Sequence, residues 1–351
     1  MNSTKRDLGL GWLLLAASAA VAFLRAPRLI LEPRLWAEEG ESFFQYAYHV
    51  DFWQGLFYAE RYSGGYFLLI GTLPSALAAR FCPIESVAAW FTAWAFAVLL
   101  LPLAIIAFGK SYVWDTAGRR VAACGVVLFA PTAIGEVWLN ITNAQVYLGL
   151  ASVCIVCEDL RDARWPRICV LASVLVLAGL SGPYTSFLVP AFLFKLALDH
   201  SLGARAHALV VVAAASVQVL VFLSLAGSGQ LHESKLAGYD WELSAVHTAY
   251  AQFLAPIFGH MLPHVVGGWF GLDAQLFEGP LGLEHFILGV GAVAWLLLGL
   301  ALLWPRRLRS IQGVLWVGLL GLAIGTTVGA KNGLAGGRYA VLPGFTLLFL
   351  L

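Results

Sequence analysis

Long apolar runs separated by short polar stretches make up most of the sequence. The runs of spanning or near-spanning length fall at about residues 8–24, 86–108, 121–135, 144–156, 168–180, 186–198, 206–226, 284–304, 311–330 and 340–351. A helix needs about 20 apolar residues to cross the hydrocarbon core of a bilayer, so the shorter runs would need their flanks. The pattern predicts an all-α, polytopic transmembrane helical bundle of about 10 to 11 spans. We expect residues 1–351 to form a single membrane domain.

The two ends of the sequence bear on this expectation. Lys5 and Arg6 precede the first run, which continues past a signal-cleavage-like Ala17-Ser18-Ala19 to Leu24. Because the run does not stop there and further spans follow, we expect an uncleaved first span with a cytoplasmic N-terminus. The sequence ends at Leu351 inside an apolar run, as a C-terminally truncated chain would.

Basic residues gather in the tight loops between alternate runs. The positive-inside rule then places 13 of the 21 Lys and Arg in the cytoplasm and 14 of the 20 Asp and Glu outside. This assignment requires that the apolar segment 66–79, which contains Gly71 and Pro74, does not cross the membrane fully. We therefore expect it to be interfacial or re-entrant. The long outer segments are then a first external loop, residues 26–85, and a second segment, residues 227–283, with interfacial helices expected in the external loops.

Composition agrees with a membrane protein and excludes several functions. The chain is 60% hydrophobic and 12% charged, with a mean hydropathy of +0.81, whereas soluble domains are about 25% charged. The net charge of +1 comes without a basic stripe, so we expect no nucleic-acid partner. The short cytoplasmic loops leave no room for a nucleotide-binding domain, which disfavours a nucleotide-driven pump. Five cysteines in mostly apolar runs indicate helix packing.

An acidic cluster follows the first span directly. Glu38, Glu39 and Glu41 stand within four residues. Carboxylates in such a setting suit a general base that deprotonates a hydroxyl, or an oxygen ligand set for a divalent metal. The alternative is that they only solvate a loop. The dense aromatic residues from Trp36 to Tyr66 favour a functional interpretation, because they belong at a membrane interface and also offer flat faces to sugar rings.

Two further outer segments carry polar residues. Glu136, Asn140 and Asn143 lie between two apolar runs, where polar groups are costly unless they have partners. On a helix the two asparagines would share a face and could bind a substrate hydroxyl. Capping of the next span is the alternative. Tyr184 follows a tight turn on the same predicted side of the membrane.

A late pair of residues suggests a phosphate site. Arg338 and Tyr339 follow two glycines that would allow close approach, and a guanidinium can bind two phosphate oxygens at once. Lys331 is a second candidate. The alternative is a basic side chain that reaches out to the headgroup region.

Together these residues resemble the glycosyltransferase C superfamily, polytopic membrane enzymes that use polyprenyl-phosphate sugars. The likeness rests on the layout of the first loop, on an Asn-x-x-Asn segment (Asn140 to Asn143) and on an Arg-Tyr pair before a late span. In the bacterial members that the chain resembles most, the acidic motif reads Trp-x-Glu-Asp-Gly. Here it reads Trp36-Ala37-Glu38-Glu39-Gly40, so Glu39 stands at the aspartate position and either glutamate is a candidate base.

The resemblance implies an enzyme of the bacterial inner membrane that transfers a hexosyl or pentosyl group on the outer face. Its partners would be a polyprenyl-phosphate-linked sugar, membrane lipid, and a cell-envelope glycan, lipid or protein acceptor. Glu39 or Glu38 would act as the base or hold a divalent metal, and Arg338 would offset charge on the lipid phosphate. The other residues that would line the pocket are Trp36, Glu136, Asn140, Asn143, Tyr184, Lys331 and Tyr339. The alternatives are a lipid or solute transporter, which would carry charged residues deep in its spans, and a scaffold or polymerase subunit.

Overall fold

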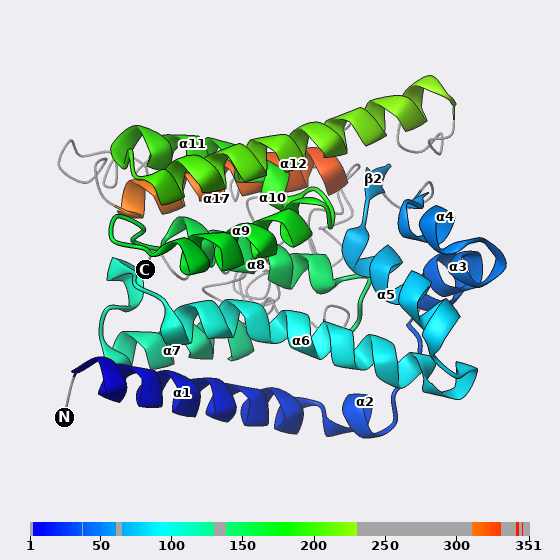
Figure 1. Ribbon diagram of the computed structural model, residues 1–351, viewed down its shortest axis with the longest axis horizontal. Helices are drawn as coiled ribbons and strands as arrows, with labels where there is room; N and C mark the ends of the chain where they lie inside the picture. The colour runs from blue at the N-terminus through cyan, green and yellow to red at the C-terminus, as the bar shows by residue number, and fades with distance from the viewer. Residues whose placement is uncertain are drawn as a thin grey trace, which may run out of the picture.

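The computed structural model describes residues 3–36, 38–60, 65–129, 138–229 and 311–330, together with 342, 343 and 346. Its helices are α1 (Ser3–Arg25), α2 (Pro27–Leu31), η1 (Glu39–Phe44), α3 (Gln45–His49), α4 (Phe52–Leu56), α5 (Leu69–Phe81), η2 (Ile84–Ser86), α6 (Val87–Phe108), η3 (Tyr112–Trp114), α7 (Ala117–Phe129), α8 (Ala144–Val156), α9 (Trp165–Gly179), α10 (Tyr184–Phe187), α11 (Val189–Leu198), α12 (Leu202–Gly227) and α17 (Ile311–Ala330) (Figure 1). Two short strands, β1 (Ala59–Glu60) and β2 (Tyr66–Phe67), pair antiparallel. The predicted helical class is confirmed.

Within the described ranges, three segments are long and apolar enough to cross a membrane. They are Leu8–Arg25, Ile84–Phe108 and Leu202–Gly227, and they coincide with three of the predicted runs. Helices α8, α9 and α11 are apolar but shorter. These are the helices of a membrane protein. The run expected at 284–304 and the second outer segment from residue 230 onward lie outside the described residues.

Helix boundaries follow local sequence signals. The hydroxyl of Ser201 accepts a backbone N–H at the start of α12, and the carboxylate of Asp51 accepts two at the start of α4. These caps satisfy donors that have no partner inside the helix. Pro166 and Pro190 stand in the first turns of α9 and α11, where a missing N–H costs little.

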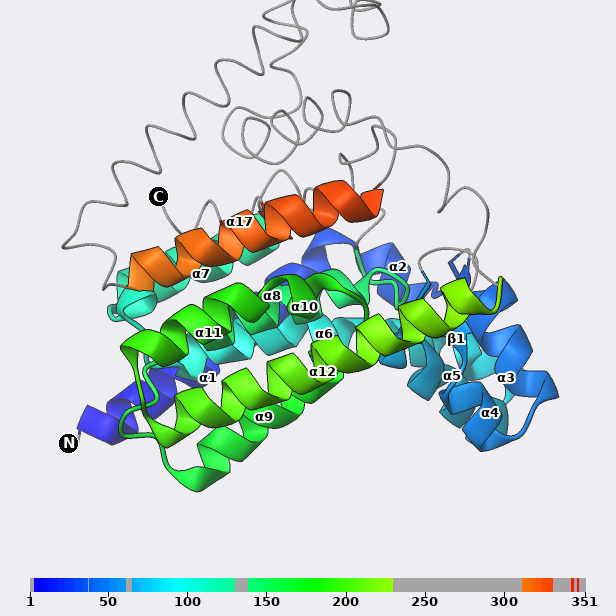
Figure 2. The same ribbon diagram turned by 90° about the horizontal axis from the view of Figure 1, so that it is seen from above.

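Helix α8 is the centre of the bundle. All thirteen of its residues are buried, and it contacts α6 on one side and α9 on another (Figure 2). The peripheral helices α1 and α12 instead leave large apolar side chains exposed, including Trp12, Leu13, Leu209 and Leu220. A continuous exposed apolar surface on a helix is stable against lipid.

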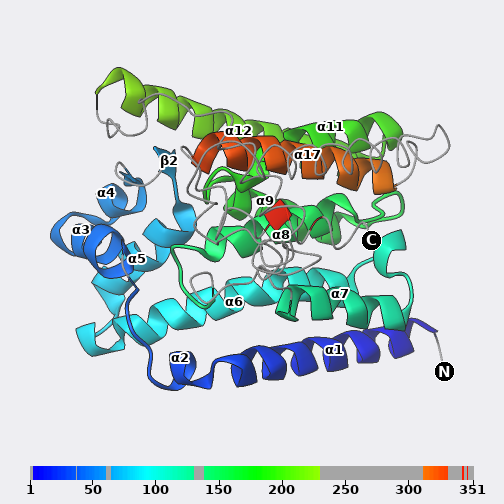
Figure 3. The same cartoon turned by 180° about the vertical axis from the view of Figure 1, so that it is seen from behind.

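The connections between helices gather at two ends of the bundle (Figures 1 and 3). One end holds the N-terminus and the loops at 109–116 and 157–164, which carry most of the described loop Lys and Arg residues. We call it the basic end. The other holds η1, α3, α4 and α5 with the 138–143 turn, and we call it the aromatic end. Helix α5, the core of the segment expected not to cross, packs against η1, α3 and α4 at this end.

Candidate functional site

The acidic motif folds into a tight turn around Glu39. This residue begins the π-helical turn η1 and is only 2% exposed. Its carboxylate accepts the backbone N–H of Trp36 at 2.7 Å and the backbone N–H of Ile141. Because Ile141 lies 102 residues further along the chain, one carboxylate joins the segment after α2 to the 138–143 turn.

The environment of Glu39 also changes its acidity. Burial raises the pKa of Glu39 from 4.5 to about 6, and the N–H groups of Trp36 and Ile141 partly oppose that shift. A carboxyl that titrates close to neutral pH is suited to proton transfer. Near-complete burial and two backbone bonds, however, keep this carboxylate away from a substrate.

The raised pKa of Glu39 gives a pH-dependent stability. A folded-state pKa above the unfolded value means that this contribution is fully present below pH 4.5 and is lost as pH rises through about 6. We expect the free energy of unfolding of the native chain, relative to Glu39→Gln, to fall by about 2 kcal/mol between pH 4.5 and pH 7. Denaturant titrations at both pH values measure this difference. Equal pH dependence of the two proteins would contradict it, and the exposed Glu41→Gln variant is the control.

In the 138–143 turn, the backbone N–H of Ile141 faces Glu39, and the side-chain amides of Asn140 and Asn143 are buried. The side-chain oxygen of Asn140 accepts the N–H of Asn143 at 2.8 Å, and both residues are buried. This bond satisfies the backbone donor of Asn143, which is the N-cap residue of α8 but makes no capping hydrogen bond with its side chain. Leu139 has a φ of 52°, a conformation that a non-glycine residue keeps only where its surroundings enforce it. The turn is therefore held in a defined shape.

Gln145 connects the same turn to the first outer loop. Its amide nitrogen donates to the Tyr66 hydroxyl and to the Thr142 carbonyl, both at 3.2 Å. Its amide oxygen faces Gly182, whose N–H donates to the Phe67 carbonyl at 3.0 Å. Strand β2, the 138–143 turn and the 180–182 turn thus form one polar cluster.

Gln218 of α12 fastens this cluster to a membrane span. Its amide oxygen accepts the N–H of Phe67 at 2.9 Å, and its amide nitrogen donates to the carbonyls of Phe67 and Gly179 at 3.0 and 2.9 Å. Gln218 was not among the residues predicted from the sequence to belong to the site. The signal was present, because a lone amide inside an apolar span needs partners.

Gly182 is a sensitive position in the cluster. Its φ is +96°, and a Cβ there would lie 2.0 Å from the side-chain oxygen of Gln145. We expect Gly182→Ala to lower the free energy of unfolding by about 1–3 kcal/mol, measured by thermal unfolding in detergent. Gly125→Ala is the matched control, since a Cβ there meets open space on α7 and should be neutral or slightly stabilising. Equal stability of the two variants would refute this assignment.

The other candidate residues that the structure describes differ in their burial. Trp36 is half-buried, with the guanidinium of Arg34 5.3 Å from its ring centroid. Glu38 is half-buried and Glu41 is exposed. Tyr184 is buried in α10 beside Gly149 of α8, away from any exposed surface. Four candidates lie outside the described residues: Glu136, Lys331, Arg338 and Tyr339.

The described acidic and cysteine side chains form neither a metal-binding group nor a disulfide. Among the residues that the structure describes, no group of three or more His, Cys, Asp or Glu side chains is arranged to hold a metal ion. The glutamates of the acidic motif therefore do not converge on one point. All five cysteines carry free thiols, and Cys154 and Cys157 are buried at the end of α8 as expected from helix packing.

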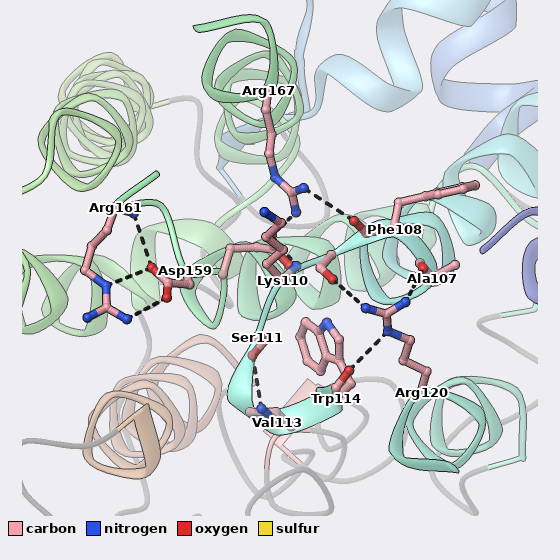
Figure 4. A network of polar contacts seen from close by, with 12 residues as sticks. Ala107, Phe108, Lys110, Ser111, Val113, Trp114, Arg120, Asp159, Arg161 and Arg167 are labelled. Atoms are coloured by element: carbon pink, nitrogen blue, oxygen red, sulfur yellow. Dashed lines mark hydrogen bonds and ion pairs between the residues drawn. The ribbon is translucent and has the colours of Figure 1, made fainter. Parts of the chain in front are cut away.

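The basic end contains a second polar network (Figure 4). The buried carboxylate of Glu158 accepts the N–H of Lys110 at 3.1 Å and pairs with the guanidinium of Arg167. The ammonium of Lys195 donates to the Glu158 carbonyl. Arg120 donates to the carbonyls of Ala107 and Gly109 at 3.4 and 3.2 Å, which are acceptors that the end of α6 leaves open, and to the Trp114 carbonyl of η3 at 3.2 Å. These contacts tie the helix ends together.

Comparison with known proteins identifies no relative: no protein-family model, no curated protein and no solved structure matches the chain.

Proposed function

We propose that this protein is a polytopic glycosyltransferase of a bacterial inner membrane. It has about 10 to 11 spans and a cytoplasmic N-terminus, and it transfers a sugar from a polyprenyl-phosphate donor to a cell-envelope acceptor on the outer face. The observation that carries the proposal is that the Glu39 carboxylate accepts two backbone hydrogen bonds, one from the N–H of Trp36 and one from the N–H of Ile141. It holds an acidic motif, a pair of buried amides and a tryptophan together at one end of a membrane bundle.

Glu38 and Glu39 have different roles in the proposed reaction. Glu39 is buried and bonded to backbone on both sides, so it positions the loop. Glu38 is only half-buried, which leaves its carboxylate accessible to an acceptor. Glu38 takes the proton from the acceptor hydroxyl, the oxygen bonds to the anomeric carbon, and the bond from that carbon to the phosphate oxygen breaks. The polyprenyl phosphate leaves with the electron pair.

Exposed aromatic residues beside the motif support a substrate that combines sugar and lipid. Tyr46 and Tyr58 stack with ring centroids 4.2 Å apart, and Trp53 and Phe57 stack at 6.2 Å. Trp53 and Phe57 are largely exposed. Such rings settle at a membrane interface and offer apolar faces to a sugar.

The distribution of charge supports the proposed orientation. Described cations such as Lys110, Arg120, Arg161 and Arg167 gather at the basic end, which also holds the N-terminus (Figures 1 and 4). The positive-inside rule assigns such an end to the cytoplasm. The aromatic end then faces outward, toward the compartment in which envelope polymers are assembled.

Incubation of the purified full chain with a labelled polyprenyl-phosphate sugar and a short acceptor glycan tests the proposal. We expect label to appear on the acceptor and unlabelled polyprenyl phosphate to accumulate. Movement of the intact labelled lipid between the leaflets of vesicles, without sugar transfer, would show that the protein is a lipid transporter and not a glycosyltransferase. Neither transfer nor movement over a panel of hexose and pentose donors would refute the proposal.

A further inference from the structure

Three aromatic rings stack on one another at the aromatic end. Trp53 lies in α4 and Phe57 follows its last residue, so the two side chains are one helical turn apart. Their ring centroids are 6.2 Å apart with an angle of 14° between the ring planes, and Phe57 stacks on Phe67 of β2 at 6.4 Å and 25°. Trp53 and Phe57 are 64% and 66% exposed, whereas Phe67 is 7% exposed. The aromatic stack of Trp53, Phe57 and Phe67 therefore runs from a buried strand to the surface.

The buried end of the aromatic stack is fixed by a membrane span. Strand β2 lies beside α12 at the aromatic end (Figure 1). The buried Gln218 of α12 accepts the N–H of Phe67 and donates to the Phe67 carbonyl, so one amide binds both backbone groups of this residue. It also donates to the Gly179 carbonyl at the end of α9. These bonds restrict rotation of the Phe67 backbone, so the ring on which Phe57 stacks has a defined position.

The exposed end of the stack is held by close packing of α4. A Cβ at Gly55 would lie 3.3 Å from Ala47 of α3 and 3.7 Å from Ala76 of α5, so α4 lies directly against both helices. The Asp51 carboxylate accepts two backbone N–H groups in the first turn of α4. The helix that carries Trp53 is thus fixed at its start and along one face, while the indole stays on the surface.

The surroundings of the exposed rings are polar. Asp51 and Gln54 are both exposed within two residues of Trp53. A carboxylate and an amide are costly in hydrocarbon and stable in water. A sugar uses both kinds of surface, because its C–H face packs against an aromatic ring and its hydroxyls bond to carboxylate and amide groups. An acyl chain would gain nothing from the polar groups.

We propose that Trp53 and Phe57 form a carbohydrate subsite that binds a sugar of the acceptor glycan, and that Gln218 positions this subsite through Phe67. A lipid-linked donor arrives through the bilayer, whereas the polar surroundings of Trp53 suit a ligand that arrives from water. The identification of the sugar as an acceptor rests on the proposed function. The binding of a sugar to the two rings does not.

Binding of fluorescently labelled cellotriose, maltotriose and chitotriose to the full chain in phosphatidylcholine nanodiscs tests the subsite. We expect at least one trisaccharide to bind, and Trp53→Ala to weaken that binding about tenfold because the stacking face is lost. Trp53→Phe keeps an aromatic face and should bind within about threefold of the native chain. Phe81→Ala is the matched control and should bind as the native chain does, since Phe81 is an exposed aromatic residue of α5 that is not part of the stack.

Gln218→Met tests the positioning role. Methionine has a similar length but makes none of the three hydrogen bonds, so we expect trisaccharide binding to weaken about threefold or more. The same change in a Trp53→Ala background should have no effect, because Gln218 acts through the stack. In the transfer assay Gln218→Met should raise the acceptor KM and leave kcat unchanged. Equal effects in the two backgrounds would overturn the positioning role. Gln218→Asn provides the same comparison if Gln218→Met does not fold.

Three outcomes would overturn the subsite itself. The first is that none of the trisaccharides binds the native chain, and the second is native affinity in Trp53→Ala. The third is quenching of the Trp53 emission, taken as the difference between the native chain and Trp53→Phe, by phospholipid brominated on its acyl chains, which would place this ring in the bilayer. Binding that depends on Trp53 in a protein that transfers no sugar would keep the subsite and refute the glycosyltransferase. Sugar transfer with a native acceptor KM in Trp53→Ala would keep the glycosyltransferase and refute the subsite.

Discussion

Glu38→Gln is expected to slow sugar transfer strongly while the protein remains folded. The glutamine keeps the shape of the side chain but cannot take a proton, and a positioned general base contributes about 10²- to 10⁴-fold to a rate. We therefore expect the transfer rate to fall by about 100-fold or more. The half-buried position of Glu38 predicts an unchanged thermal transition. The rate is measured with the labelled donor and saturating acceptor.

Two other variants of the acidic motif test whether the effect is specific to Glu38. Glu41→Gln is the matched control, because Glu41 is exposed three residues away and should leave the rate unchanged. Glu39→Gln should lose stability and part of its activity together, since it weakens the bonds to Trp36 and Ile141. Full activity of Glu38→Gln with an inactive but stable Glu39→Gln would reverse the two roles.

Glu158→Ala is expected to cause the largest loss of stability among the variants considered. Glu158 is buried, and its carboxylate is paired with Arg167 and with the N–H of Lys110. Removing one partner of a buried ion pair leaves the other charge without compensation, at a cost of about 3 kcal/mol. Denaturant titration in detergent measures the change in the free energy of unfolding.

The control for Glu158 is the acidic residue that follows it. Asp159 pairs with Arg161 at 2.6 Å, but both side chains are partly exposed. Exposed ion pairs contribute about 0–1 kcal/mol, so Asp159→Ala should be nearly neutral. If Glu158→Ala and Asp159→Ala lost equal stability, the contacts of Glu158 with Arg167 and Lys110 would not stabilise the packing of the helix ends as proposed.

Much of the helical framework could be predicted from the sequence. The runs expected at 144–156 and 311–330 match α8 and α17 to the residue, because apolar length alone determines such helices. The structure of the segment between α2 and α5 was harder to predict from the sequence than the long helices. Its short helices and the pair of strands β1 and β2 depend on contacts such as those of Gln145 and Gln218, which come from segments far away in the sequence.

The candidate site was predictable as a set of residue types but not as an arrangement. The acidic motif and the two asparagines stood out because polar groups beside apolar runs are costly. Which glutamate is buried could not be read from the sequence, since Glu38 and Glu39 are adjacent and chemically alike. That difference comes from the N–H of Ile141, which only the folded chain brings to Glu39.

Helix α8 is too short to cross a bilayer by itself. Thirteen helical residues extend about 20 Å, whereas the hydrocarbon core is about 30 Å thick. The longer α6 lies beside α8 and continues past it in Figure 1. Because every residue of α8 is buried, its length need not match the thickness of a bilayer as that of a lipid-facing span must.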